Sequence, residues 1–217
     1  MAFSRRITTV TLSALWLLAL TILAGYALYT SHIYNLPIPN TLSALTLALP
    51  PIAGLVLETS SALANSLHST PRLRNAVRST IPPVLLPGTL AIVALLMYET
   101  VIATLAGTHI APRTALKCAL EERWRDMFRA KDGESVARIQ DAFQCCGLRS
   151  SRHMAFPFPD REHGADACEV RYERTRGCFE AWEGQERVVA GIMMAVAVGV
   201  FLWMVSSSIP SHLSICN

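Results

Sequence analysis

Long runs of apolar residues alternate with short polar segments along this chain, and one longer polar segment precedes the last run. A helix needs about 20 predominantly apolar residues to cross a bilayer, and every run is long enough. Pro50 and Pro51 interrupt the second run, but a membrane helix tolerates proline where neighbouring helices satisfy the freed carbonyl groups. The pattern predicts an all-α membrane protein with four transmembrane helices, the second of them kinked. They occupy residues 7–29, 41–67, 81–111 and 188–209.

The first run follows Arg5 and Arg6, and a basic pair before an apolar run also opens a secretory signal peptide. This run is longer than the apolar core of a signal peptide, and no convincing cleavage site follows it. We therefore interpret it as the first transmembrane helix.

The few charges between the apolar runs predict the orientation of the chain. The connection 68–80 carries three arginines and no acid, whereas the connection 30–40 carries no Asp, Glu, Lys or Arg. Basic residues concentrate in the cytoplasmic connections of membrane proteins. We therefore expect both termini in the cytoplasm. As a separate expectation, we assign the chain to the plasma membrane. The cytoplasmic segments would be 1–6, 68–80 and 210–217, and the extracellular ones 30–40 and 112–187.

The composition agrees with a membrane protein and argues against a nucleic-acid partner. Hydrophobic residues make up 52% of the chain and charged residues 16%, below the roughly 25% of an ordinary soluble domain. The segment 112–187 contains fourteen basic and fourteen acidic residues, so it is neutral and lacks the basic surface that binds phosphate backbones. The expected partners are the bilayer and other integral membrane proteins, with a homo-oligomer as a further candidate.

The large polar segment begins with two stretches of helical periodicity. The sequence Lys131-Asp132-Gly133 lies between them and is a turn signal, with Gly133 suited to the end of the first helix. We expect a helical hairpin whose apolar side chains pack between the two helices. These side chains are Leu116, Leu120, Trp124, Met127 and Phe128 in the first helix, and Val136, Ile139, Ala142 and Phe143 in the second.

Two adjacent cysteines, Cys145 and Cys146, follow the second of these helices and precede Gly147. Neighbouring Cα atoms lie about 3.8 Å apart, below the roughly 4.4 Å at which ordinary disulfides begin, so the two cysteines do not bond to each other. Each must find a partner elsewhere, and Gly147 allows the chain to turn sharply there. Several connectivities stay open, because the candidate partners are Cys118, Cys168 and Cys178.

The order of these features resembles that of the tetraspanins: four spans, a small and then a large extracellular loop, and a Cys-Cys-Gly motif after a helical hairpin. The segment 139–147, Ile-Gln-Asp-Ala-Phe-Gln-Cys-Cys-Gly, followed by Phe156-Pro157-Phe158-Pro159, looks like the tetraspanins of filamentous fungi. The resemblance implies disulfides from Cys145 to Cys178 and from Cys146 to Cys168.

The resemblance also implies a non-enzymatic organiser that binds other membrane proteins through its large loop, in fungal polarised growth or host penetration. Cys118 would then be a surplus cysteine, which we expect to be a buried free thiol beside the two disulfides. For the partner surface we expect exposed side chains in the segment 148–177, namely Phe156, Phe158, Arg161 and His163.

The only acids within the apolar runs are Glu58 and Glu99, and ionisable residues inside a membrane are candidates for function. They support an alternative function, a lipid-handling protein, transporter or channel, in which Glu99 lines a cavity for a sterol or other lipid. The simpler interpretation is that each acid is protonated or hydrogen-bonded to a neighbouring helix. Near the C-terminus, Cys216 is a candidate for S-acylation.

No catalytic motif is evident, so we do not expect an enzyme. The adjacent cysteines make a poor exchangeable dithiol for a redox enzyme. His153, His163 and the acids around them follow no familiar ligand spacing, which argues against a metal site. We expect no cofactor beyond a candidate bound sterol or other lipid.

Overall fold

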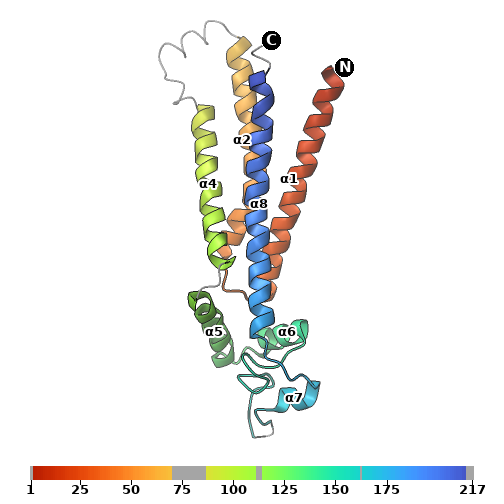
Figure 1. Cartoon of the computed structure of the whole chain (residues 1–217), viewed down its shortest axis with the longest axis vertical. Helices are drawn as coiled ribbons and strands as arrows, with labels where there is room; N and C mark the ends of the chain where they lie inside the picture. Colours follow the sequence, from red (N-terminus) through yellow and green to blue (C-terminus); the bar gives the residue numbers. More distant parts are fainter. Residues whose placement is uncertain (1, 70–86, 111–113, 162, 214–217) are drawn as a thin grey trace. The chain divides into compact units, whose positions relative to one another are not determined.

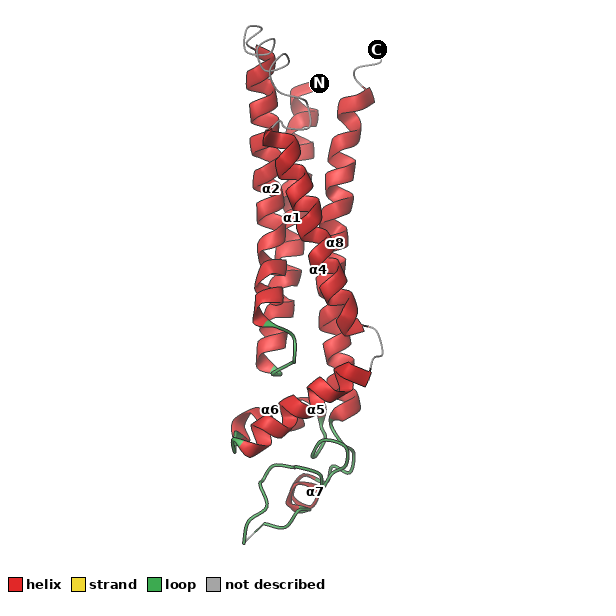
Figure 2. Cartoon of the chain, turned by 90° about the vertical axis from the view of Figure 1, so that its left-hand side faces the viewer, coloured by secondary structure: helices red, strands yellow, loops and turns green. Residues whose placement is uncertain are grey.

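The computed structural model describes residues 2–69, 87–110, 114–161 and 163–213. Within these ranges the chain is helical and contains no strand (Figure 2), apart from an isolated bridge between Ser150 and Arg176. The arginines of the predicted basic connection and the candidate acylation site Cys216 lie outside the described residues.

Four long helices confirm the predicted fold class of an all-α membrane protein. In these helices, each of the stretches Ile7–Ile33, Asn40–Ala62, Gly88–Ile110 and Phe179–Ser207 is long and apolar enough to cross a membrane. The second helix continues through Pro50 and Pro51. The four helices are α1 (Ala2–Ile33), α2 (Asn40–Ser69), α4 (Pro87–Ile110) and α8 (Phe179–Leu213).

The chain divides into two compact units. The first comprises Met1–Tyr26, Ala44–Leu105 and Ile192–Asn217, and in it α1, α2, α4 and α8 run alongside one another (Figure 1). The described start of α1 and end of α8 lie at the same end of this bundle, together with the end of α2. Four long helices that alternate in direction bring both described ends of the chain to the same end of the bundle.

Small residues let the helices of the first unit approach closely. A Cβ atom added to Gly199 of α8 would lie 2.9 Å from the Leu20 side chain of α1, and the Trp16 indole N–H donates to the Gly199 carbonyl at 3.3 Å. In the same unit the Tyr98 hydroxyl of α4 donates to the Leu45 carbonyl of α2 at 2.6 Å. These contacts place α8 beside α1, and α2 beside α4.

The second unit comprises Ala27–Ser43 and Ala106–Gly191. It contains the two helices of the predicted helical hairpin, α5 (Thr114–Arg129) and α6 (Gly133–Phe143), and a short helix α7 (Ala167–Tyr172). Its core is the edge-to-face pair of Trp124 and Trp182, whose ring centroids lie 5.6 Å apart. Leu120, Val136 and Ile139 are buried as predicted, whereas Ala142 is exposed.

The turn between α5 and α6 differs from the prediction. The left-handed residue after α5 is Lys131, with a φ of 56°. The Asp132 N–H bonds the Met127 carbonyl, and the Lys131 N–H bonds the Phe128 carbonyl, which is the Schellman pattern of a helix end. Gly133 instead begins α6, where a Cβ atom would lie 2.6 Å from the Phe156 ring. The expectation that Gly133 ends the first helix is therefore wrong.

Candidate functional site

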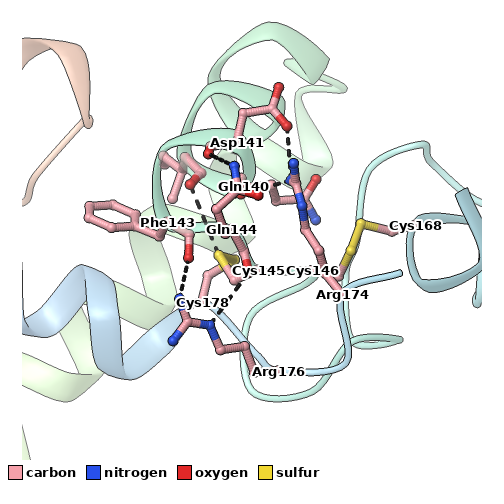
Figure 3. Close-up of polar contacts among 11 residues, drawn as sticks. Gln140, Asp141, Phe143, Gln144, Cys145, Cys146, Cys168, Arg174, Arg176 and Cys178 are labelled. Atoms are coloured by element: carbon pink, nitrogen blue, oxygen red, sulfur yellow. Dashed lines mark hydrogen bonds and ion pairs between the residues drawn. A yellow bond between two sulfur atoms is a disulfide. The ribbon is translucent and has the colours of Figure 1, made fainter. Parts of the chain in front are cut away.

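Two disulfides join three segments of the second unit around the Cys-Cys-Gly motif (Figure 3). Cys145, directly after α6, bonds to Cys178 at the start of α8, and their Cα atoms lie 5.1 Å apart. Cys146 bonds to Cys168 in α7 with a Cα separation of 5.9 Å. This pairing is the one that the resemblance to tetraspanins implies. All four cysteines are buried.

Hydrogen bonds hold the end of α6 against the segment that returns to α8 (Figure 3). The Arg174 guanidinium donates to the Gln140 carbonyl and to the Asp141 carboxylate, each at 2.9 Å. The Arg176 guanidinium donates to the Phe143 carbonyl at 2.7 Å. Arg176 therefore satisfies a carbonyl group that a helix leaves without a partner at its C-terminal end. Arg174 adds a donor to the Gln140 carbonyl, which also accepts from the Gln144 and Cys145 N–H groups.

Gly147 makes the sharp turn that the sequence predicts. Its φ is 62°, and a Cβ atom would come within 2.6 Å of the His153 carbonyl oxygen. With the Gln140 amide oriented so that its oxygen faces the turn, that oxygen accepts from the Gly147 N–H at 2.7 Å and the amide nitrogen donates to the Phe156 carbonyl at 3.0 Å. The buried Gln140 side chain thus joins α6 to the Cys-Cys-Gly turn and to the following loop.

The short connection before α2 belongs to this unit, which the sequence analysis did not predict. Leu36 and Ile38 are buried, the Tyr34 ring lies 5.2 Å from the Phe143 ring, and the Tyr34 carbonyl accepts from the Trp182 indole at 2.9 Å. The apolar spacing of Leu36 and Ile38 in an uncharged segment was the available signal. The small connection therefore supports the large loop rather than merely joining two helices.

Cys118 forms no disulfide, as expected, but its side chain is exposed. The expectation of a buried thiol is wrong, because the apolar face of α5 is formed by Leu120, Trp124 and Met127. One turn of helix spans 3.6 residues, so position 118, two residues before Leu120, points away from this face.

The two phenylalanines expected on the partner surface are partly buried. The Phe158 ring packs edge-to-face against Phe128 and Phe156, with centroid distances of 5.2 and 5.3 Å, and the Lys131 ammonium lies 4.8 Å from its centroid. Phe156 and Phe158 are therefore only partly exposed, because they cover the turn between α5 and α6.

Other side chains of the loop are more accessible. Arg161 is exposed, and His163 is partly exposed, with its Nδ1 atom 3.0 Å from the Asp160 carboxylate. In α7, Val170 is 74% exposed and Tyr172 is 36% exposed. Among the described residues of 111–178, these two are the large hydrophobic side chains that face outward, and the sequence analysis did not single them out.

Polar contacts hold α7 in place beside the disulfide. The Ser151 hydroxyl donates to the Glu169 carboxylate at 2.8 Å, and the Arg152 guanidinium donates to it at 3.2 Å. These hydrogen bonds, that of Ser151 first, lower the pKa of Glu169 from its ordinary value. The carboxylate therefore keeps its charge and its contacts under mildly acidic conditions.

The acids of the long helices lie in different surroundings. Glu58 is exposed on α2. Glu99 of α4 is only 4% exposed, and neither of its carboxylate oxygens has a hydrogen-bond partner within the described part of the chain. Glu186, which the sequence analysis assigned to the loop, is fully buried within α8, and its Oε1 atom lies 2.8 Å from Nδ1 of His109 in α4. Glu186 lies in α8 because this helix is continuous from Phe179 onwards.

The loop thus carries accessible apolar and charged side chains beside two disulfides. Comparisons of the chain with family models, with curated proteins and with solved structures gave no match.

Proposed function

We propose that the chain is a tetraspanin-like, non-enzymatic organiser that binds other integral membrane proteins through its large loop. The observation that carries this proposal is that a disulfide from Cys168 attaches α7, with exposed Val170 and Tyr172, to the Cys-Cys-Gly turn, and that the second disulfide joins the same turn to Cys178. Exposed apolar side chains on a rigid support lose little conformational freedom on binding, and tyrosine is frequent among the residues that dominate interfaces.

The proposed surface combines these two residues with the accessible Arg161 and His163 of the same loop. Two guanidinium groups flank the Tyr172 ring, that of Arg174 at 4.9 Å and that of Arg171 at 5.5 Å from the centroid. An aromatic ring between cations favours a partner that offers apolar contacts together with acidic groups.

The test compares two substitutions that add the same charge to the same loop. Val170→Glu should reduce recovery of a co-purified membrane protein in mild detergent at least tenfold, because it places a carboxylate in the centre of the proposed contact. Ala130→Glu is the matched control, since Ala130 is also exposed but lies between α5 and α6, outside the set of residues that forms the proposed surface. Equal recovery with both variants would reject the α7 surface, provided that both show the thermal unfolding of the wild type.

A second candidate, a lipid-handling protein, transporter or channel, is favoured by one observation. Glu99 lines a cavity of about 220 Å³ within the bundle unit. Glu58 does not line this cavity and is exposed, so the geometry offers no pair of acids that could relay a proton between them. Proton-coupled or ion-coupled transport that Glu99→Gln abolishes would favour this candidate over the organiser.

A further inference from the structure

Glu99 lies at the floor of a groove between α4 and α8 in the first unit. The groove has a volume of about 220 Å³, and its other α4 residues include Leu96, Thr100 and Ala103. The Tyr98 hydroxyl bonds to α2, and each successive residue of a helix is rotated by about 100°. The contact of Tyr98 with α2 therefore turns the adjacent Glu99 towards α8.

The carboxyl group of Glu99 has no hydrogen-bond partner among the residues that the structure describes. Both of its oxygens are buried without a hydrogen bond, and the neighbouring Thr100 hydroxyl already donates to the Leu96 carbonyl of its own helix at 2.7 Å. Neither α4 nor residues 188–213 of α8 contain a Lys or Arg. A buried carboxyl group without a hydrogen bond is unfavourable in either protonation state, and a cation beside it would favour the charged form. The groove therefore lacks one hydrogen-bond donor.

The walls of the groove are apolar and open outward. Leu96 and, in α8, Val198 and Phe201 are exposed at its edges. The occupant must therefore be apolar along most of its length and must reach a recessed acid. Serine and threonine are too short for this, and the equally recessed Glu99 of a second copy could not meet the first.

We propose that this groove binds a transmembrane helix of a partner protein that carries a lysine or arginine, with the cation paired to Glu99. Such side chains have a long apolar stem that lies along apolar walls and a terminal group that only donates hydrogen bonds. Charge complementarity thus selects this occupant over an apolar helix. The site is independent of the loop surface proposed above, so the two can fail separately.

The test uses the full chain reconstituted in phosphatidylcholine vesicles with a synthetic leucine-rich transmembrane helix. The helix carries one guest residue, lysine or leucine, at the depth of Glu99. All chains carry Cys216→Ala, so that energy transfer from a dye on Cys118 to a dye on the helix reports association. The wild-type chain should bind the lysine helix at least tenfold more tightly than the leucine helix. Glu99→Gln should remove this preference.

Two further variants keep the outcome clear. Glu58→Gln is the matched control, because it removes an acid from the apolar part of α2 that lies outside the groove, and it should leave the preference unchanged. Ala103→Leu fills the groove while retaining the acid, and it should abolish binding even if Glu99→Gln fails to fold.

Three results would overturn the proposal. The first is equal binding of the lysine and leucine helices to the wild-type chain. The second is a lipid that co-purifies with the wild type and is lost from Glu99→Gln, which would make the groove a lipid site. The third is self-association of the chain that Glu99→Gln abolishes.

Discussion

At the scale of single residues, Gly147 is the position where the fold depends most directly on one side chain being absent. Its φ of 62° is unfavourable for other residues, and a Cβ atom would press against the carbonyl groups of residues 150 and 153. We expect Gly147→Ala to lower the free energy of unfolding by about 1 to 3 kcal/mol. Thermal unfolding of the detergent-solubilised chain, with its disulfides intact, measures this effect.

The matched control for that measurement is Gly184→Ala. Gly184 lies inside α8, and a Cβ atom there would meet no atom within 4 Å. Alanine should stabilise this helix by roughly 0.5 to 1 kcal/mol relative to glycine. If both substitutions moved the unfolding temperature in the same direction, the strained turn at Gly147 would not be the cause.

At the scale of elements, the sequence could predict each helix whose apolar pattern is strong. The four long helices and the pair α5 and α6 follow directly from runs or periodicity, because burial of apolar groups dominates their formation. Their ends are less predictable. Lys131 rather than Gly133 adopts the left-handed conformation, since Gly133 lies where the Phe156 ring leaves no room for a side chain. That contact is tertiary and leaves no local signal.

The candidate site, too, could be predicted only in part from the local sequence. Adjacent cysteines cannot bond to each other, which is a local constraint, but their partners depend on how α7 and α8 fold back. Exposure is also a tertiary property: two consecutive Phe-Pro pairs were expected on the surface, yet their rings cover the α5–α6 turn. Val170 and Tyr172 lie in a short helix whose periodicity is too brief to reveal its exposed side.

Helix α6 offers a test of one such local contact through pH. The Asp132 carboxylate accepts from the Ser135 N–H at 3.1 Å and caps the helix. Hydrogen bonds from the Ser135 side chain and backbone lower the pKa of Asp132. A lowered pKa means that the charged group stabilises the folded state above its ordinary pKa of about 3.9. This contribution is lost as the pH falls through the lowered value.

We therefore expect Asp132→Ala to reduce stability at pH 7 by about 1 kcal/mol, the usual cost of losing a helix cap. The difference from wild type should shrink as the pH falls below the ordinary range of aspartate, because the wild type then loses its charged cap as well. Asp132→Asn retains a capping oxygen and should be closer to the wild type at pH 7. Thermal unfolding measured by tryptophan fluorescence from pH 7 down to pH 3 would follow both effects, and a constant difference across that range would contradict them.

At the scale of the whole molecule, the orientation of the chain in the membrane can be tested with its own thiols. Four cysteines are in disulfides and Cys118 is an exposed free thiol in the large loop, while Cys216 belongs to the expected cytoplasmic tail. If the arginine-rich connection is cytoplasmic, a membrane-impermeant maleimide should label Cys118 on intact cells and reach Cys216 only after permeabilisation. Cys118→Ala should remove the first signal and Cys216→Ala the second.

Labelling of Cys118 only after permeabilisation would place the loop inside the cell, where the cytosol keeps thiols reduced and structural disulfides are rare. The orientation and the proposed extracellular partner surface would then both be wrong.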